Sequence, residues 1–438
     1  IYCPSFPNIP KSYTPNEPAI QRALRNNYDP YLQTKDRLKQ FELLGQLKKG
    51  AKIEVIILGG TFMALDSSFR EWFIKRIFDA LNGKESKSLE EAHLINESSD
   101  YRCVNLTVET RPDYCFEKHV DEMLRYGATR VEIGVQTLRD EVLEYIKRGH
   151  DVDAVRKAFR IARDSGLKIV AHMMPNLPPN PSVKRDFEDF MRLFDDPDFR
   201  PDMLKIYPTA VVKGTKLYDM WIRGEYEPYS EDKLIDLLAK VKKLIPPWVR
   251  IQRLQRDIPT YLVEAGYSSG NLRQVVLDYM RKRGWRCRCI RCREVGHKML
   301  KEGIYIDFDA VRLINRRYMA SGGVEVFLSF ENVERDIILG LLRIRKPSNM
   351  AHRPEIDANT MIIRELHVYG PLVPLGERNA NSAQHRGYGA RLLMEAERIA
   401  VEDFDARKIL IISGIGVREY YRRFGYKLEG PYMSKRLS

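Results

Sequence analysis

The sequence predicts an α/β protein whose first half is a parallel sheet covered by helices, either open or closed into a partial or full (β/α) barrel. Apolar runs rich in β-branched residues alternate there with amphipathic helical segments. Parallel strands are buried on both faces and therefore read as continuous apolar runs. From about residue 300 the pattern becomes antiparallel, and a chain of 438 residues is long enough for more than one domain.

Each element follows from its local pattern. The expected strands of the first half are Ile53–Leu58, Arg102–Thr107, Arg130–Val135, Leu167–His172 and Met203–Ile206. The expected helices are Phe69–Asn82, Cys115–Tyr126, Asp151–Ser165, Lys184–Phe194 and Asp232–Leu244, the last ending before the helix-breaking Pro246-Pro247. The second half predicts strands at Val324–Phe330, Ile337–Arg345, Met361–His367 and Lys408–Ser413, a helix at Gly389–Ala400 and a turn at Gly414–Gly416.

Polar and glycine residues stand at the ends of the expected parallel strands. Gly59-Gly60-Thr61 follows the first strand, and Glu109, Gln136 and Lys205 lie at or near the ends of later ones. The carboxyl ends of parallel strands meet at one edge, where ligands bind. The residues together therefore predict a site, although any one of them could belong to a turn.

The run Gln384-His385-Arg386-Gly387-Tyr388-Gly389 lies between an expected strand and an expected helix. Free backbone N–H groups at a helix N-terminus bind phosphate, and glycines let the backbone approach the anion. The run predicts a pyrophosphate cradle for acetyl-coenzyme A, with an ordinary strand-to-helix turn as the alternative. The order of strand, cradle, helix, strand and short tyrosine-bearing helix resembles the GNAT acetyltransferases.

Tyr420 and Tyr421 lie in that short helix. A positioned phenol can protonate the thiolate that leaves from coenzyme A. The alternative is that both rings pack in the core with a hydrogen-bonded hydroxyl. We expect both residues to be catalytic.

The charge of the chain indicates a polyanionic partner. The formal net charge is +13 and the pI is near 9.3, and phosphate contacts supply most non-specific nucleic-acid affinity. Arginine and lysine side chains are concentrated around Trp285. Before it, Arg250, Arg253 and Arg256 follow one another at intervals of three residues. The expected contacts are Arg250, Arg253, Arg256, Arg281, Arg283, Arg286 and Arg288, with a solvated charged face as the alternative.

The cysteines indicate metal chemistry. Cys287, Cys289 and Cys292 are closely spaced, and His297 follows. Structural zinc takes Cys₃His or Cys₄ ligand sets. We expect zinc at these four residues, although a distant residue could replace His297 and reduced thiols without metal are the alternative.

Motifs along nearly the whole chain resemble the family of the Elongator catalytic subunit, in its archaeal form. The matching stretches are Pro10–Thr14, Glu17–Ala19, Gly59–Phe62, Glu109–Cys115, Gly134–Gln136, His172–Pro175, Asp202–Pro208, Gln255–Pro259, Cys287–Gly296 and Gln384–Tyr426. The resemblance implies a radical S-adenosylmethionine (SAM) barrel at 1–265, a zinc-binding basic linker at 266–300 and a GNAT acetyltransferase domain at 301–438.

The resemblance also implies an activity, the formation of 5-carboxymethyluridine at position 34 of the tRNA anticodon. In the family's proposed reaction a [4Fe–4S] cluster cleaves SAM, and the radical activates the methyl group of acetyl-coenzyme A for attack on C5 of uridine. By position, SAM would contact Gly59, Gly60, Thr61, Glu109, Gln136 and Lys205. Acetyl-coenzyme A would contact Leu366, His367, Val368, Gln384, His385, Arg386, Gly387, Tyr388, Gly389 and Tyr421. Lys205 joins the tyrosines as a catalytic candidate.

One departure concerns the cluster. The family holds it with three cysteines in C-x₄-C-x₂-C spacing, of which only Cys3 stands in this sequence. Cys103 and Cys115 are wrongly spaced to replace the other two. On the chain as given we therefore expect no normal cluster.

Two rival functions remain open from the sequence: a protein lysine acetyltransferase of the histone type, and a tRNA-binding sensor of acetyl-coenzyme A without turnover. A basic chain favours RNA over basic tails. We expect a cytoplasmic protein without a membrane span. Dimerisation and a need for accessory Elongator subunits are left open.

Overall fold

The computed structural model describes residues 1–179, 181–304, 306–370 and 387–437, and its strands form two large sheets. The first contains six parallel strands in the order β1-β2-β3-β4-β5-β7. Their bounds are β1 Lys52–Ile57, β2 Arg102–Thr110, β3 Ala128–Gln136, β4 Lys168–Met173, β5 Met203–Ile206 and β7 Arg250–Arg253. Within the described ranges nothing pairs β1 with β7, so the predicted barrel is an open half-barrel.

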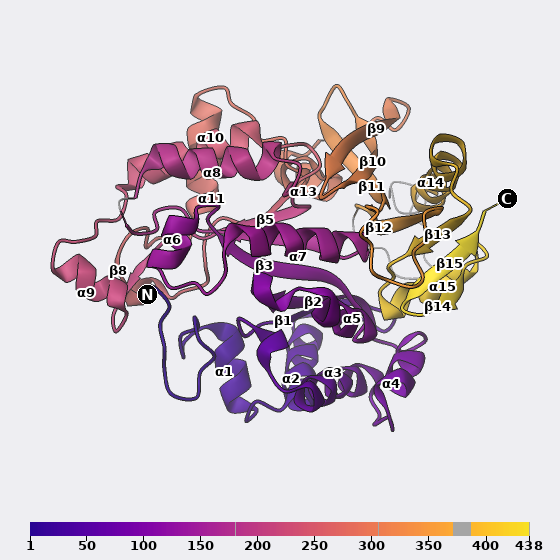
Figure 1. The fold of residues 1–438 in the computed structure, drawn as a ribbon, viewed down its shortest axis with the longest axis horizontal. Coiled ribbons are helices and arrows are strands. Elements are labelled where there is room, and N and C mark those ends of the chain that lie inside the picture. The colour runs from indigo at the N-terminus through magenta and orange to yellow at the C-terminus, as the bar shows by residue number, and fades with distance from the viewer. Residues whose placement is uncertain (180, 305, 371–386, 438) are drawn as a thin grey trace.

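Helices run between these strands and cover the outer face of the half-barrel (Figure 1). The predicted helices appear as α3 Ser67–Asn82, α5 Glu117–Arg125, α7 Val152–Asp164, α8 Val183–Asp195 and α10 Glu231–Leu244. The sequence did not predict β7, nor the helices α1 Pro18–Arg25, α2 Pro30–Leu43, α4 Leu89–Asn96, α6 Asp140–Tyr145, α9 Lys216–Ile222 and α11 Leu272–Lys282. A small antiparallel pair joins β6 Val211–Val212 to β8 Val263–Ala265.

Side-chain caps mark where several helices begin. Asp66 accepts from the backbone N–H groups of Ser68 and Phe69 at the start of α3, and Asp151 accepts from Ala154 at the start of α7. Such caps satisfy N–H groups that have no partner inside the helix. The amphipathic faces then pack inward, as Val155, Phe159 and the neighbouring apolar residues of α7 show.

The second sheet has seven strands in the order β14-β15-β13-β12-β11-β10-β9. Only β12 and β13 pair in parallel; the other neighbours are antiparallel. α14 corresponds to the helix predicted at Gly389–Ala400 and packs against this sheet through Leu392, Leu393, Ala396 and Ile399. The bounds are β9 Val311–Ala320, β10 Gly323–Asn332, β11 Ile337–Lys346, β12 Thr360–Val368, α14 Tyr388–Phe404, β13 Lys408–Ile411, α15 Arg418–Arg422, β14 Lys427–Glu429 and β15 Tyr432–Arg436.

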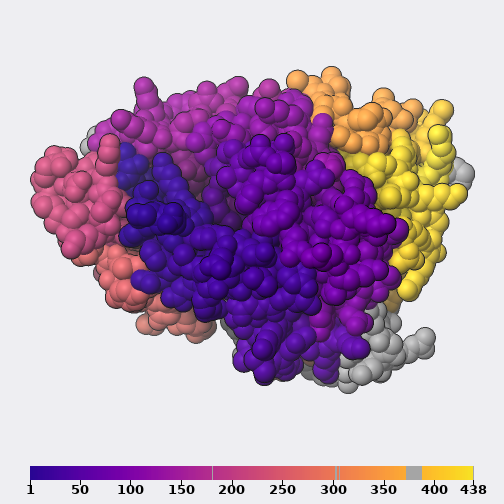
Figure 2. Space-filling model, turned by 90° about the horizontal axis from the view of Figure 1, so that it is seen from below, coloured from indigo at the N-terminus to yellow at the C-terminus, as the bar shows by residue number. Residues whose placement is uncertain are grey.

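The two sheets meet through buried ion pairs. Arg364 of β12 donates to both carboxylate oxygens of Asp202, at 2.9 and 2.6 Å, and to Glu325 at 3.0 Å. Arg345 of β11 donates to Asp164 at the end of α7 at 2.6 Å. On the face seen in Figure 2 the C-terminal segment, in yellow, abuts the first half, in purple. The two halves therefore form one packed body.

The predicted turn at Gly414–Gly416 also lies in this contact. A Cβ atom on Gly414 would fall 2.1 Å from the carbonyl oxygen of Val104, and one on Gly416 would fall 2.4 Å from Cβ of Arg102. The turn therefore approaches the start of β2 as closely as backbones can, and only glycine fits.

The segment between the sheets contains α12 Ile290–Arg293 and α13 Val295–Glu302. The buried guanidinium of Arg293 pairs with Glu331 and, at 2.7 Å, with Asp336 of the second sheet. The backbone N–H of Ile290 donates to Val249, beside β7 of the first sheet. The segment is thus fastened to both sheets. Among the described residues, no helix combines the length and the apolar character that crossing a membrane requires.

Candidate active site and metal centre

Glu109 gathers the predicted residues at the carboxyl edge of the half-barrel. It lies near the end of β2, and its Oε2 accepts from the backbone N–H groups of Gly59 and Gly60 at 3.3 and 3.2 Å. Tyr13 donates its hydroxyl to the same oxygen at 2.6 Å. Burial, followed by the charge of Glu109, raises the pKa of Tyr13. The structure therefore brings Gly59, Gly60 and Glu109 together, as the sequence predicted, and adds Tyr13.

A second carboxylate lies deeper, inside the half-barrel. Glu132 of β3 is fully buried, and its Oε2 contacts Lys205 of β5 and lies 2.8 Å from Nε2 of His172 of β4. Burial alone would raise the pKa of Glu132, but hydrogen bonds and charge from His172 and Lys205 outweigh it and hold the pKa well below its usual range. Lys205, a predicted site residue, is thus joined to His172, which begins one of the matching stretches, and to Glu132, which the sequence did not single out.

The remaining predicted residues of this edge lie in loops and strand ends. Gln136 ends β3 in the left-handed backbone region, with φ of 73°, and its side-chain oxygen is buried without a hydrogen-bond partner among the residues that the structure describes. Thr61 precedes a short 3₁₀ turn. Arg148 donates to the carbonyl of Gly134 at 3.3 Å, so an additional cation lies close to Gln136.

Cys3 lies next to this edge. Ser12 donates its hydroxyl to Cys3 Sγ at 2.9 Å, and Arg256 contacts the carbonyl oxygen of Ser12. The Arg256 guanidinium also lies 5.9 Å from the ring centroid of Tyr13. Arg256, which the sequence assigned to RNA, is therefore held against the N-terminal segment.

Strands β12 and β13 of the second sheet separate in the region where the sequence predicted an acetyl-coenzyme A site. Only Thr360 to Ile363 of β12 pair with β13, and the strands part before Leu366, His367 and Val368. Gly387 is the N-cap of α14, with φ of 72° and no side-chain cap. Gln384, His385 and Arg386 lie outside the described residues. The described part of the cradle therefore combines an open strand edge with an uncapped helix N-terminus.

The two tyrosines occupy different environments. The hydroxyl of Tyr420 lies 2.9 Å from the position that a Cβ atom on Gly389 would take, so it stands against the amino end of α14. Tyr421 is buried, with its ring 6.2 Å from that of Tyr426. Burial raises the pKa of both hydroxyls, so each stays protonated at neutral pH.

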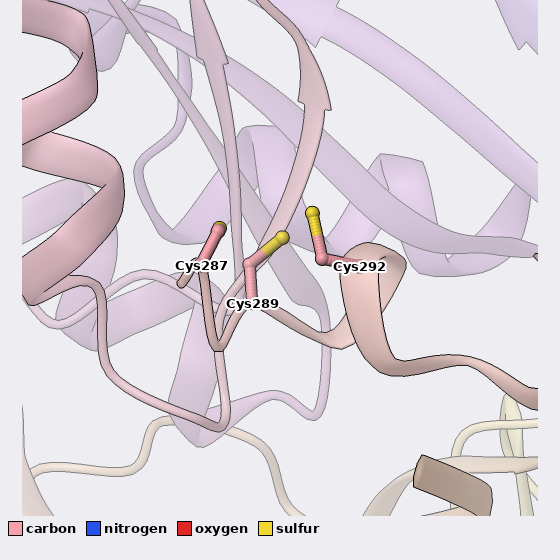
Figure 3. A group of neighbouring side chains, drawn as sticks. All are labelled: Cys287, Cys289 and Cys292. Atoms are coloured by element: carbon pink, nitrogen blue, oxygen red, sulfur yellow. The ribbon is translucent and has the colours of Figure 1, made fainter. Parts of the chain in front are cut away.

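The three clustered cysteines converge (Figure 3). The sulfur atoms of Cys287, Cys289 and Cys292 all lie within 4.8 Å of one another. Hydrogen bonds from the two neighbouring thiols lower the pKa of Cys289. His297 is not brought to the group; its Nε2 lies 2.8 Å from Glu294. Instead, the buried ammonium of Lys242 lies 3.3 Å from Cys287 Sγ and 3.8 Å from Cys292 Sγ.

The predicted RNA contacts divide into two groups. Arg281, Arg283, Arg286 and Arg288 are exposed on α11 and the loop after it. Arg250 contacts Glu294 and is partly buried, whereas Arg253 is exposed and pairs with Asp257. The first group is exposed to a polyanion, although Arg281 also pairs with Asp278 and Arg288 with Asp336, whereas the partly buried Arg250 is held by Glu294.

The chain is similar to known proteins along its length. Residues 8–194 match the Radical SAM superfamily, and residues 201–282 match the Radical_SAM C-terminal domain. The chain is 51% identical to a tRNA uridine(34) acetyltransferase of Methanocaldococcus jannaschii over 443 residues, covering all of this chain and 81% of that protein. It is 47% identical to Elongator complex protein 3 of Homo sapiens, covering all of this chain and 80% of that protein.

A solved structure is similar over almost the whole fold. It is the archaeal Methanocaldococcus infernus Elp3 with an N-terminal deletion of residues 1–46. The TM-score is 0.90 at 51% identity, covering 95% of this chain and 97% of that one.

Proposed function

Because this chain belongs to the family of the tRNA uridine(34) acetyltransferases and Elongator complex protein 3, we propose that it is an enzyme that modifies uridine 34 of tRNA with acetyl-coenzyme A. The observation that carries the proposal is the similarity along the whole chain, at 51% identity to an archaeal member. Both candidate sites lie inside the aligned region. The product that we propose is 5-carboxymethyluridine.

The carboxyl edge of the half-barrel is the proposed site for SAM. The backbone N–H groups of Gly59 and Gly60 converge on Glu109 there, and Arg148 and the unpartnered oxygen of Gln136 lie near the end of β3. This set offers a carboxylate, a cation and an amide to a ligand with amino, carboxylate and hydroxyl groups, so the residues fit SAM. Bound to a reduced iron–sulfur cluster, SAM supplies the radical that activates an otherwise inert methyl group. Cys3 would be one ligand of that cluster.

The parting of β12 and β13 is the proposed site for acetyl-coenzyme A. Leu366, His367 and Val368 pair with β11 on one side, and within the described residues the other side of this segment has no strand partner. Backbone groups that face that side can hydrogen-bond an extended amide chain, as a neighbouring strand would. The uncapped N-terminus of α14 then receives the pyrophosphate, with Gly387 and Gly389 permitting close approach. Tyr420 is placed to donate a proton to the leaving thiolate, because its hydroxyl lies beside Gly389.

The three cysteines and their surroundings support a structural zinc site. Their sulfur atoms are close enough together to bind a single ion, and thiolates are ligands that zinc prefers. Lys242 occupies a further side of the group, where its charge offsets that of the thiolates. Zinc would hold the exposed Arg286 and Arg288 in place, because both residues flank the cysteines in sequence. In this proposal the two arginines contact tRNA.

The test is acetyl-coenzyme A hydrolysis with and without tRNA, followed by mass analysis of uridine 34 in a protein that carries the complete cysteine motif. Hydrolysis that depends on tRNA, with a carboxymethyl mass gain, is the expected result. RNA-independent transfer to lysine peptides would instead establish a protein acetyltransferase, and binding without turnover would establish a sensor. Arg286→Glu should weaken tRNA binding at least tenfold and leave acetyl-coenzyme A binding unchanged. Asp278→Lys reverses charge in the opposite direction on the same helix; it removes the partner of Arg281 and should not weaken tRNA binding.

A further inference from the structure

Glu132 is a buried carboxylate that packing alone does not require. It lies within β3 between Val131 and Ile133, and all three residues are fully buried. Ionised groups lose their hydration when they are buried, so an apolar side chain in this place would cost less. A carboxylate here therefore calls for a role that uses its charge.

Its charge is used by two side chains, one on β4 and one on β5. Oε2 of Glu132 contacts the Lys205 ammonium and lies 2.8 Å from Nε2 of His172, whereas its Oε1 has no partner among the described residues. Lys205 and His172 lie opposite each other in the register of β4 and β5. One carboxylate oxygen thus holds both side chains.

His172 connects this group to the carboxyl edge. Nδ1 of His172 lies 3.9 Å from Glu109, the residue that binds the N–H groups of Gly59 and Gly60. The ring of His172 meets that of Tyr207 edge-on at 5.3 Å. Lys205 makes no other hydrogen bond or ion pair within the ranges that the structure describes, so donors of its ammonium, which carries three N–H groups, remain unused.

We infer that Glu132 is a positioning residue: it holds Lys205, with His172, so that an N–H donor of Lys205 meets a carbonyl oxygen of the substrate at the carboxyl edge. This inference rests on the proposed function. The substrates offer two such oxygens, the thioester carbonyl of acetyl-coenzyme A and the C4 carbonyl of uracil. A buried, preorganised donor stabilises charge that develops on either oxygen during the reaction.

The test compares Glu132→Gln, Lys205→Met and the double variant in tRNA-stimulated acetyl-coenzyme A hydrolysis. Loss of one such donor lowers kcat by about 10²-fold, and we expect this for Lys205→Met and for Glu132→Gln, with KM for acetyl-coenzyme A within about threefold of wild type. If Glu132 acts through Lys205, the double variant matches Lys205→Met. Glu132→Asp should recover part of the activity.

The control is Glu54→Gln, which removes a half-exposed carboxylate of β1 that pairs with Arg130. Glu54→Gln should change kcat only slightly. In combination with Lys205→Met, the two fold-changes in kcat should multiply, as expected for independent residues. Wild-type kcat in Glu132→Gln, or an effect that multiplies with Lys205→Met, would overturn the inference. If Glu132→Gln does not fold, the double variant, which has no unpaired charge, is compared with Lys205→Met in its place.

Two further readouts separate the possibilities. Loss of whatever hydrolysis the wild-type protein shows without tRNA would identify the thioester carbonyl, whereas loss of tRNA stimulation alone would identify uracil. Absence of tRNA-stimulated hydrolysis in the wild-type protein would refute the proposed function itself, before any variant is compared.

Discussion

Asp202→Asn should destabilise the whole chain, because Asp202 neutralises cations at the contact between the two sheets. Asp202 is fully buried, accepts two hydrogen bonds from Arg364 and lies 3.6 Å from Arg343. A guanidinium stays charged in proteins. Among the described residues, the asparagine variant therefore leaves Arg364 with Glu325 as its one charged partner and leaves Arg343 with Glu365.

Removing one partner of a buried ion pair costs about 3–5 kcal/mol. At about 2 °C per kcal/mol for a large domain, the expected fall in Tm is roughly 6–10 °C. The free energy of unfolding would be measured by urea titration at pH 7, with calorimetry for Tm. The arginines also hold the pKa of Asp202 well below its usual range, so this stabilisation is present at neutral pH and is lost as the pH falls below the unfolded-state pKa of about 4.

Asp121→Asn is the matched control. Asp121 also joins the two halves, through His352 and Arg353 at 2.8 Å each, but its side chain is 40% exposed. Exposed pairs contribute about 0–1 kcal/mol. If Asp202→Asn cost less than about 1 kcal/mol, or no more than the control, buried charge would not be what joins the two sheets.

Three further predictions concern the metal, the cofactor cradle and pH. Cys289→Ser should lower bound zinc per chain and weaken tRNA binding, measured by metal analysis and gel shift; full zinc retention would contradict the assignment. Gly389→Val should weaken acetyl-coenzyme A binding at least tenfold by calorimetry, because a Cβ atom would meet the Tyr420 hydroxyl at 2.9 Å, and normal affinity would rule out the cradle. Burial raises the pKa of Asp186 to about 6, above its unfolded value of about 3.9, so the stability it contributes is complete below pH ~4 and is lost as the pH rises through about 6. Asp186→Asn should therefore flatten the stability profile between pH 4 and 7, and an unchanged profile would refute the sign.

The sequence predicted the parallel strands, their main helices and the antiparallel second half, because apolar periodicity reports burial directly. It missed β7, a strand of four residues that contains two arginines and follows two prolines. Short polar strands are defined by their neighbours rather than by their own pattern.

The sequence predicted some residues of the candidate sites and missed others, again according to whether the local pattern carries the signal. Gly59, Gly60 and Glu109 lie at strand ends, where the fold class alone indicates a ligand. Glu132 and Lys242 were missed because their partners are brought to them only by tertiary packing: Lys242 is 45 residues from Cys287. A charged residue inside an apolar strand, as at Glu132, was the one available signal.

The closeness of Gly414 and Gly416 to β2 has an evolutionary consequence. A mutation to any other amino acid at either glycine would force the backbones of the two halves apart. Gene fusions are usually tolerant at their junctions, since linkers absorb insertions and drift. Here the second half fits against the first only because Gly414 and Gly416 have no side chain. The halves of two diverged homologues should therefore not be freely interchangeable. Recombination between them would succeed only where the start of β2 and the glycine turn are inherited together.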